Sequence, residues 1–475
     1  MSKPLRIFLF IASGLLALLL FIAVALLLFV DADAYRPRLE TGASQVLGMD
    51  VRISGQLGID FFPGLHITLG DVHIGNQGID IATVKEARVS IDLLPLLKKQ
   101  VRFGSIALEH PRISIERDRD GNFNFEKPKP AGGTLPPLDL PKISLSEGTL
   151  RFMDQPSGEG FEALGCSLKV DHLRFARGKS SDLMKGLSFT AQLACEEVRK
   201  SGFTVSDLQV SAAGTNGVVD LQPVTMGVFG AKGSGSIRAD FSGAAPRYDL
   251  RYALPRFRIE EFCKPLSQQK VAEGSMDFFA NLSMRGKTVN QLRQTLAGEI
   301  SLQGKSLRLN GRDLDQELSQ FESSQNFNLV DVGAFFFAGP LGLVVTKGHG
   351  FASIFQGSGG RSEIRTLVSD WKVEGGVAQA QDVAMATNEH RIALQGGLDF
   401  VHQQFDNVTV ALIDAEGCTK VRQSIQGDFR NPVVEQPSVL KTLAGPVRKL
   451  FQMGRDLFPG GECEVFYTGS VAPPK

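Results

Sequence analysis

The hydrophobic pattern divides the chain into one long apolar run and a much longer alternating region. The run covers residues 7–30 and is interrupted only by Ser13 and Gly14. It exceeds the roughly 20 apolar residues that a helix needs to cross a hydrocarbon core of about 30 Å. No later stretch approaches this length. The pattern therefore predicts a cytoplasmic stub and single membrane anchor over residues 1–30, followed by a large body exposed to water.

The charges beside this run predict the side of the membrane on which the body lies. Lys3 and Arg6 precede the run, whereas Asp31 and Asp33 follow it. Because basic flanks stay in the cytoplasm, we expect the body outside the inner membrane. The alternative is a signal peptide, since the Ala-Val-Ala sequence at residues 23–25 has the small-x-small pattern of a cleavage site. Cleavage there would leave an apolar new terminus, so the pattern favours an uncleaved anchor.

One amphipathic helix is predicted directly behind the anchor. Tyr35, Leu39 and Ala43 fall on one stripe of period 3.6, Pro37 lies in the first turns, and Gly48 ends the helix. From residue 51 onward the apolar period changes to two, which predicts strands with one apolar face. The clearest examples are Val51/Ile53, Leu65/Ile67/Leu69, Val89/Ile91/Leu93, Ile113/Ile115 and Phe123/Phe125.

Turn residues and linkers divide this alternating region into modules. The dipeptide at residues 120–121, Asp-Gly, predicts a hairpin, and the Pro- and Gly-rich stretch that begins at Lys127 predicts a linker. We expect a first module over 31–126, a linker over 127–141, a middle β-rich segment over 142–300 and a C-terminal β module over 301–475. Helical stripes are expected at 259–266, 289–296, 314–321 and, as a terminal helix, 439–451.

The charge balance, the aromatic content and the cysteines limit the classes of partner and the cellular compartment that we expect. The 51 basic and 51 acidic residues balance, which argues against nucleic acid as a partner. Phe outnumbers Tyr by 33 to 4, so the aromatic residues supply apolar area without a polar group. The five cysteines have no metal-ligand spacing. In an oxidising compartment Cys418 could pair with Cys463, and Cys166 with Cys195, whereas the other interpretation is buried free thiols.

The sequence contains no complete catalytic, cofactor-binding or metal-binding motif. The chain contains neither HExxH nor GxSxG. Gly304, Lys305 and Ser306 imitate the end of a phosphate loop, but Glu299 stands where the loop requires glycine. Residues 116–121 imitate a calcium loop with the wrong first ligand. We therefore expect a protein that is not an enzyme and that uses no cofactor.

Ordered motifs along most of the body resemble those of the AsmA family of bacterial envelope proteins. The N-terminal ones are Asp-Ala-Tyr-Arg at 33–36, the segments 51–57 and 62–67, Ala-Arg-Val-Ser-Ile-Asp-Leu-Leu-Pro at 87–95, the segment 110–115 and Gly-Asn-Phe-Asn-Phe at 121–125. The C-terminal ones lie at 375–378, 396–400, 427–432 and 462–471. Residues 150–300 match only in general character.

The resemblance implies a fold and a function. Family members are similar to bridge-like lipid transfer proteins, so the expected fold is mainly β with minor α: an elongated, mostly antiparallel, curled sheet that forms an apolar trough. The implied function is outer-membrane biogenesis by passage of phospholipids between membranes, from a single-pass inner-membrane anchor with the bulk of the chain in the periplasm. The alternative is an anchored scaffold or assembly factor for outer-membrane proteins.

Residues of the predicted strands are the candidates for the lipid-lining surface. They share the apolar face of the first module: Ile67, Leu69, Ile91, Leu93, Ile113 and Ile115. The candidate disulfide is Cys418–Cys463. Periodicity alone leaves open whether these apolar faces line a trough or pack against a second sheet.

Overall fold

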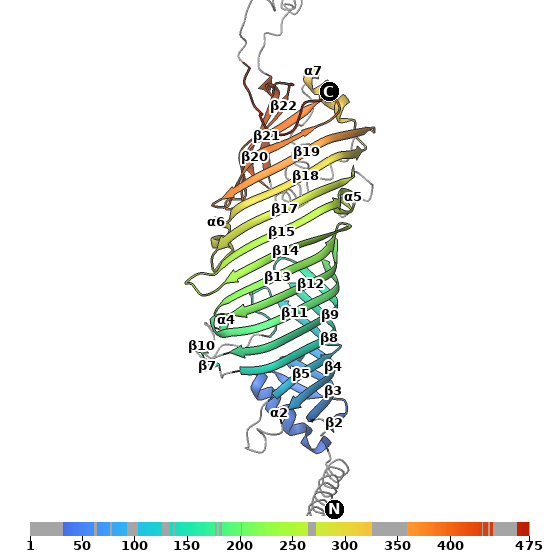
Figure 1. Ribbon diagram of the computed structural model, residues 1–475, viewed down its shortest axis with the longest axis vertical. Coiled ribbons are helices and arrows are strands. Elements are labelled where there is room, and N and C mark those ends of the chain that lie inside the picture. The colour runs from blue at the N-terminus through green and yellow to red at the C-terminus, as the bar shows by residue number, and fades with distance from the viewer. Residues whose placement is uncertain are drawn as a thin grey trace, which may run out of the picture. The chain divides into compact units, whose positions relative to one another are not determined.

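The computed structural model describes residues 32–60, 64–76, 78–92, 103–125, 134–135, 138–175, 178–179, 183–200, 202–264, 272–324, 359–429, 431–435, 438–439 and 463–474. The chain folds into two compact units, Met1–Gly217 and Val218–Lys475. Both consist mainly of antiparallel strands with a few short helices (Figure 1). The mainly β fold with minor α is therefore confirmed. No helix among the described residues is long and apolar enough to span a membrane, and the predicted anchor lies outside them.

Unit 1 is a sheet that is preceded by one helix. Strands β1 and β2 both pair with β3, β4 pairs with β3, β5 and β6, and β8, β9, β11 and β12 continue the antiparallel order. Strands β5 and β6 run parallel to β8. The elements are η1 Ala32–Tyr35, α2 Arg36–Leu47, β1 Asp50–Ile53, β2 Leu57–Asp60, β3 Leu65–Asn76, β4 Ile79–Ile91, β5 Phe103–Glu109, β6 Arg112–Arg117, β7 Thr134–Leu135, β8 Leu138–Asp154, β9 Glu159–Phe175, β10 Gly178–Lys179, α4 Leu183–Gly186, β11 Leu187–Lys200 and β12 Phe203–Thr215.

Helix α2 forms where the sequence predicts it. Pro37 lies in its first turn, and Gly48 ends it with a left-handed backbone, φ 67°, a conformation that glycine adopts without steric cost. The Glu40 side chain accepts a hydrogen bond from the main-chain N–H of Ile53 at 2.7 Å. Leu39 and Ala43 pack against the buried residues of β1, β3 and β4. The helix is thus fastened to the first strands of the sheet.

A line of residues with left-handed backbones, which we call the bulges of unit 1, crosses its sheet. Asp71, His110, Glu147, Gly165 and Asp207 have left-handed backbones, with φ between 44° and 58°. They belong to β3, the β5–β6 connection, β8, β9 and β12 respectively. Each of these residues interrupts the alternation of its strand, so apolar residues an odd number of positions apart, such as Leu145 and Leu150, can project from the same face. Between β8 and β9 the register also shifts at Gly148. The apolar face thus continues across the line.

Unit 2 continues as antiparallel neighbours in chain order. Strand β13 pairs with β14, β14 with β15, β15 with β17, and β17 to β23 each pair with the next strand (Figure 1). The elements are β13 Val218–Val228, β14 Ala231–Asp240, β15 Arg247–Arg258, α5 Ile259–Cys263, β16 Ala272–Glu273, β17 Ser275–Arg285, α6 Val289–Gln294, β18 Ala297–Asn310, α7 Leu314–Ser324, β19 Arg361–Glu374, β20 Val377–Ala386, β21 Arg391–Asp399, β22 Gln404–Ile413, β23 Thr419–Asp428, β24 Asn431–Val434 and β25 Ser438–Val439.

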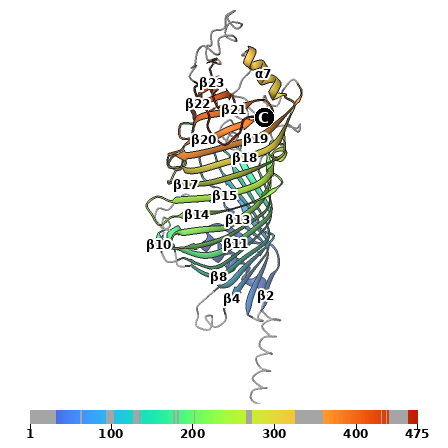
Figure 2. The ribbon, with the colours of Figure 1, turned by 45° about the horizontal axis from the view of Figure 1, so that its top comes forward.

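The late strands of unit 2 enclose a filled core. Leu307, Leu367, Ile392 and Val410 are at most 1% exposed and belong to one apolar cluster. Leu318 of α7 is completely buried in the same cluster, and α7 lies at the same end of the unit as β19–β23 (Figure 2). Protein side chains, rather than a ligand, therefore fill this part of the apolar face.

The segment 463–474 covers the other face of these strands. Phe466, Tyr467 and Val471 pack against Val368 of β19, Ile413 of β22 and alanines of β20–β22. The buried Arg391 donates hydrogen bonds to the Val471 oxygen at 2.9 Å and to the Asp414 oxygen at 2.6 Å. The late strands are consequently buried on both faces by residues of the chain itself.

Several predicted boundaries differ from the observed elements. Three helices begin where the predicted stripes begin: α5 at Ile259, α6 at Val289 and α7 at Leu314. Strand β8, however, begins at Leu138, inside the predicted linker 127–141, because its first residues pair with Phe175 and Arg174 of β9. Val439 lies in β25, paired with β23, and the rest of the predicted terminal helix falls outside the described residues.

Candidate functional site

Apolar side chains form continuous rows across the sheet of unit 1. Residues that face each other on neighbouring strands project from the same side of a sheet. In the first row, Leu108 of β5 faces Leu145 of β8, which faces Leu168 of β9. The full first row is Leu69, Ala87, Leu108, Leu145, Leu168, Leu193 and Val210.

Two further rows run beside the first. The second row, on one side, is Ile67, Val89, Ile106, Ile143, Val170, Ala191 and Ala212. The third row, on the other side of the bulges, is Ala82, Ile113, Leu150, Ala163, Val198 and Val205. We call the surface formed by the three rows the apolar face of unit 1. It contains no charged side chain.

The reverse side of the same strands is polar. Ser144 of β8 faces Lys169 of β9, which faces Gln192 of β11 and then Ser211 of β12. Lys169 and Gln192 are exposed. This alternation is typical of a sheet with one face in water, and it requires the other face to be covered or to bind something apolar.

The apolar face is covered only at its beginning. Leu39 and Ala43 of helix α2 belong to the same apolar cluster as Leu69, Ala87 and Leu108, which begin the first row on β3, β4 and β5. Leu168 and Leu193, farther along the row, are half-buried. The apolar cluster on β8–β12 consists of sheet residues, with no residue of α2 or α4 among its described members. The described residues thus leave Leu168 and Leu193 half-buried instead of closing them into a filled core, and we call this part of the apolar face, over β8–β12, the open face of unit 1.

The structure places the predicted lining residues on this face. Ile67 belongs to the second row, Leu69 to the first and Ile113 to the third. Ile91 faces Leu65 of β3, and Ile115 faces Phe152 of β8. All five are half-buried. Leu93 lies outside the described residues.

The Cys166–Cys195 disulfide lies within the apolar face. It joins β9 to β11, neighbours in the sheet, and the two residues are 7% and 5% exposed. Leu193 and Leu208 pack beside it. The disulfide thus cross-links two central strands between the first and third rows without adding a polar group. The structure also joins Cys418 to Cys463, the pair that we expected.

Aromatic residues mark one edge of the apolar face. Phe152 of β8 faces Phe161 of β9, and their stacked rings are 5.5 Å apart. Lys200 of β11 faces Phe161 and also Phe203 of β12. Phe161 and Phe203 are 36% and 40% exposed. This row, together with Ile115, lies where the strands turn into the β8–β9 and β11–β12 hairpins.

Charged side chains lie beside the aromatic row on the same face: Lys200 within the row, and Arg117, Asp154 and Glu159 one step beyond it. Asp154 faces Arg117 of β6 and Glu159 of β9. The Arg117 Nη1 atom lies 3.4 Å from the Asp154 carboxylate, and the Lys200 Nζ atom lies 3.1 Å from that of Glu159. A hydrogen bond from the Ser157 hydroxyl, together with the charge of Arg117, lowers the pKa of Asp154. We call these four charged residues the charged rim.

The apolar face of unit 2 changes from half-buried to fully buried along one row. Its first members, Leu221, Ile237 and Leu250, are half-buried. Val373 and Leu398, at the other end, are 1% and 4% exposed. The row is Leu221, Ile237, Leu250, Leu282, Gly298, Val373, Ala378 and Leu398. Only the part over β13–β15 resembles the open face of unit 1.

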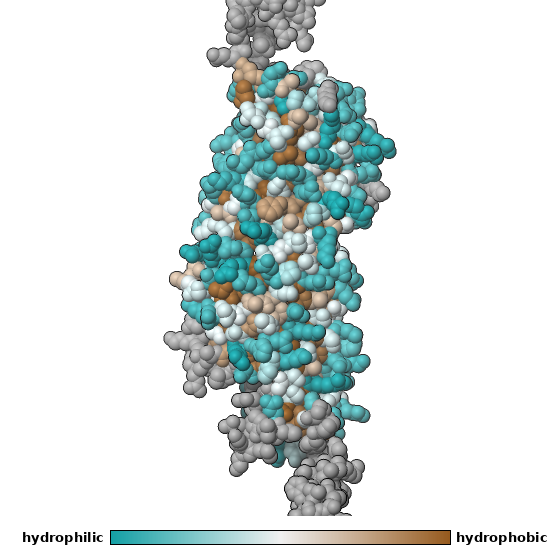
Figure 3. Space-filling model, viewed as in Figure 1, coloured by the Kyte–Doolittle hydropathy of each residue, from teal (hydrophilic) through white to brown (hydrophobic). Residues whose placement is uncertain are grey.

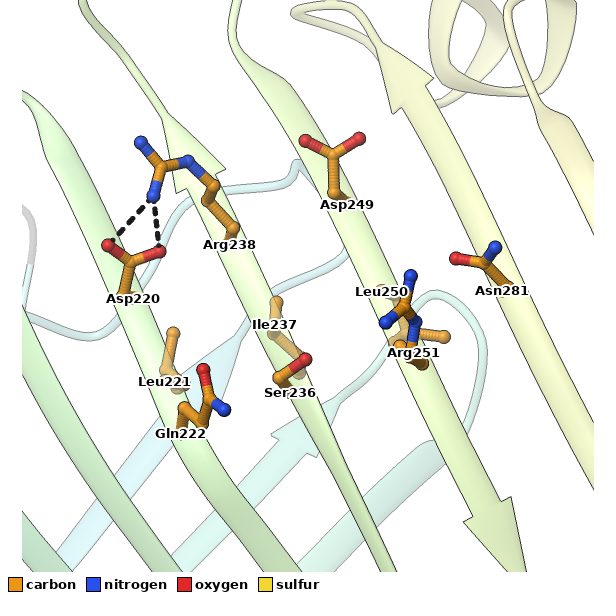
Figure 4. A pocket seen from close by; sticks show the side chains of 10 residues that line it. All are labelled: Asp220, Leu221, Gln222, Ser236, Ile237, Arg238, Asp249, Leu250, Arg251 and Asn281. Carbon is orange, nitrogen blue, oxygen red and sulfur yellow. Dashed lines mark hydrogen bonds and ion pairs between the residues drawn. The ribbon is translucent and has the colours of Figure 1, made fainter.

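A shallow hollow of about 260 Å³ lies on the polar side of unit 2. Asp220, Arg238, Asp249 and Arg251 line it together with Asn281, and they project from one side of β13–β17 (Figure 4). The Arg238 guanidinium holds Asp220 at 2.8 Å. Hydrophilic side chains predominate on the face of these strands that Figure 3 displays. Charge pairing, rather than an apolar pocket, thus characterises this surface.

A Ser–His–Asp cluster fastens α7 to the β20–β21 turn. His390 Nδ1 lies 3.1 Å from Asp315, and its Nε2 atom lies 3.4 Å from the Ser319 hydroxyl. The Ser319 hydroxyl donates to the main-chain oxygen of Asp315 at 2.8 Å, within its own helix. Thr387 also donates to the Asp315 carboxylate. These contacts connect a helix to a turn and satisfy buried polar atoms.

Reactive groups are scarce in the described part of the chain. No group of three or more potential ligands there could hold a metal ion. Cys263, the cysteine left over, is 2% exposed, and burial raises the pKa of its thiol to about 12. Burial also raises the pKa of Tyr252 on the apolar side of unit 2. Both groups therefore stay neutral at physiological pH.

Sequence reasoning missed most of the apolar face. Alternating pairs such as Leu168/Val170 and Leu208/Val210 predicted strands, but nothing in the sequence aligned them with Ile67 or Leu69. The bulges were missed as well, because Glu147 and Asp207 are not glycines. A usable signal is the switch of the apolar parity within one strand, as between Leu145 and Leu150.

The model of the AsmA family matches residues 1–175 and 174–338. The chain belongs to the AsmA family. The AsmA matches include all three rows of the apolar face and end beyond α7, so the motifs at 375–378, 396–400 and 427–432 lie outside them. No curated protein and no solved structure matches the chain. Membership of the AsmA family indicates a function in the cell envelope.

Proposed function

We propose that this AsmA-family protein supports outer-membrane biogenesis by passing phospholipids along its apolar face, with no chemical step. In this proposal residues 1–30 anchor the chain in the inner membrane and the body lies in the periplasm. The observation that carries the proposal is the continuity of the three rows across β3–β12, together with the half-buried state of Leu168 and Leu193 in the part over β8–β12.

The energetics of the open face favour an acyl-chain ligand. Burying one CH₂ group contributes about 0.8 kcal/mol, so an acyl chain laid along the rows gains many such increments. Monomeric soluble proteins rarely expose contiguous apolar patches larger than a few hundred Å² unless the patch binds something. The rows offer Leu, Ile, Val and Ala side chains without hydrogen-bonding groups, which suits a hydrocarbon and not a sugar or a peptide.

The cysteine pairs support the proposed compartment. Cys166–Cys195 and Cys418–Cys463 both join residues far apart in sequence, and disulfides of this kind persist in oxidising compartments such as the bacterial periplasm. The basic residues before the apolar run, Lys3 and Arg6, support the same topology.

The alternative function is an anchored scaffold or assembly factor for outer-membrane proteins. The observation that favours it is the filled core of β19–β23, in which Leu367, Ile392 and Val410 are completely buried. A solid body of this kind carries no lipid. The two functions differ in whether the open face of unit 1 is occupied by lipid in the cell.

A pair of neighbouring substitutions tests the conduit directly. We expect Leu168→Asp to abolish the envelope function while the protein stays folded, because the charge reaches water when no lipid is present but obstructs the acyl path. The matched control is Lys169→Asp, the next residue on the polar face of the same strand, which should keep both fold and function. Thermal unfolding and complementation of a strain that lacks the gene measure the two properties.

Lipid analysis completes the test. We expect phospholipid to co-purify with the variant that lacks residues 1–30, in amounts that mass spectrometry quantifies, and to be lost from the same variant carrying Leu168→Asp. If the folded Leu168→Asp protein retains its lipid and its function, the apolar face is not the path. If Leu168→Asp unfolds unit 1, the face is a closed core, and this result favours the scaffold function over the conduit.

A further inference from the structure

The charged rim lies where it would contact the headgroup of a phospholipid bound to the apolar face. It follows the aromatic row on the same face: Asp154 lies two residues after Phe152 on β8, and Glu159 lies two residues before Phe161 on β9. Two residues of a strand span about 7 Å. Acyl chains lying on the rows would therefore bring the headgroup of the same molecule to these charges.

The rim carries both signs in equal number. Arg117 and Lys200 are cationic, and Asp154 and Glu159 are anionic, so the formal charges cancel. The side chains of Arg117 and Lys200 are both 44% exposed, that of Glu159 is 66% exposed, and that of Asp154 is 16% exposed. The Lys200–Glu159 pair is exposed on both sides and contributes little to stability, so a ligand can replace either partner of this pair at small cost.

We infer that the charged rim binds the headgroup of a zwitterionic phospholipid, with Lys200 and Arg117 facing its phosphate and Glu159 and Asp154 facing its ammonium group. This inference rests on the proposed function and specifies its substrate class. An ammonium group offers three N–H donors to carboxylates, and a phosphate accepts from both cationic side chains. Each half of the headgroup thus finds a partner of opposite sign.

An anionic headgroup fits the same rim less well. Each cation lies within 3.4 Å of a carboxylate, so an anion that approaches Lys200 or Arg117 also approaches Glu159 or Asp154. Asp154 keeps its negative charge at neutral pH, because the Ser157 hydroxyl and Arg117 stabilise its ionised form. Attraction and repulsion then largely cancel, whereas the zwitterion gains from both signs.

The experiment uses the full-length chain and an equimolar mixture of phosphatidylethanolamine and phosphatidylglycerol with identical acyl chains. After exchange in detergent and washing, mass spectrometry quantifies each bound lipid. We expect the wild-type protein to bind phosphatidylethanolamine about two- to fivefold in excess, the size of effect typical of exposed charge pairs. We expect Glu159→Gln, and more strongly Glu159→Gln with Asp154→Asn, to move the ratio toward phosphatidylglycerol.

The control makes the same change of charge on the polar face. Glu162 of β9 and Glu197 of β11 belong to the same strands but project from the opposite side. Glu162→Gln with Glu197→Gln should leave the ratio unchanged. Equal binding of both lipids by the wild type, or an equal shift in the control, overturns the inference while the conduit stands. Absence of any bound lipid instead contradicts the proposed function itself.

Discussion

At the scale of single residues, Cys263 shows how burial controls reactivity in this protein. Cys263 belongs to the same apolar cluster as Phe257, Ile259 and Phe262, and the pKa of its thiol is raised to about 12 because burial and the nearby Glu260 disfavour the thiolate. The thiolate is the reactive form. At pH 8 only about one thiol in ten thousand is then ionised.

We therefore expect Cys263 to resist iodoacetamide at pH 8 in the folded protein and to react fully in urea. Mass spectrometry of the alkylated peptide measures the modified fraction. The two disulfides provide the internal control, since their four cysteines should stay unmodified in both conditions without reductant. Rapid alkylation of Cys263 in the folded state would show that the α5 region opens or packs differently.

Single residues also show how much of the apolar face could be predicted from the sequence. Ile67, Leu69, Ile91, Leu93, Ile113 and Ile115 were predicted as one face from their alternation. The structure places Ile67, Leu69 and Ile113 in the three rows, and Ile91 and Ile115 each two residues farther along their strands. Alternation reveals which residues of one strand share a side. It contains no information about the neighbouring strand or the register, which depend on contacts between residues far apart in the chain.

At the scale of elements, α7 depends on two leucines. Leu314 and Leu318 are completely buried against β19 and its neighbours, whereas Gln316 on the opposite side of the helix is exposed. The stripe of Leu314, Leu318 and Phe321 predicted this helix from the sequence, because a period of 3.6 is stronger evidence when three apolar residues agree.

We expect Leu318→Ala to destabilise unit 2 by about 2–5 kcal/mol, the usual cost of truncating a buried leucine and leaving a cavity. Gln316→Ala is the matched control on the same helix and should change stability by less than about 0.5 kcal/mol. Urea unfolding can be followed by the fluorescence of Trp371, the one tryptophan of the sequence, which lies in the same core. A difference below about 1 kcal/mol would mean that α7 is not part of that core.

The segment 463–474 depends on a cross-link as well as on packing. Cys418 and Cys463 are 45 residues apart, and closing such a loop contributes roughly 3–4 kcal/mol in the chain-entropy model. We expect non-reducing peptide mapping to recover this pair, and replacement of both cysteines by serine to lower the thermal midpoint of unit 2. Two free thiols in the protein isolated from cells would contradict the pairing.

At the scale of the whole molecule, the mainly β class and the family followed from the sequence, but the state of the apolar faces did not. Val373 and Leu398 are in the filled core of unit 2, and Leu168 and Leu193 are on the open face of unit 1. All four occur in similar alternating strands. What separates them is whether α7 and neighbouring strands cover the face, and strand periodicity contains no record of that tertiary contact.

The last prediction concerns the attachment of the body to the membrane. Residues 7–30 are the one run of the sequence long and apolar enough to span a bilayer. We expect deletion of residues 1–30 to release the body from membranes in sodium carbonate, while the full-length chain stays in the pellet. High pH and repeated washing remove proteins that are bound only peripherally, so contact of the apolar rows of unit 1 with a membrane surface should not keep the shortened chain in the pellet. Replacing two central leucines of the run, Leu16 and Leu19, by arginine is the matched variant, because each charge at the centre of a helix opposes insertion by about 2.5–3.5 kcal/mol. It should reproduce the deletion. A shortened chain that still resists carbonate would show that a second part of the molecule inserts into the membrane, and the single-anchor topology would be wrong.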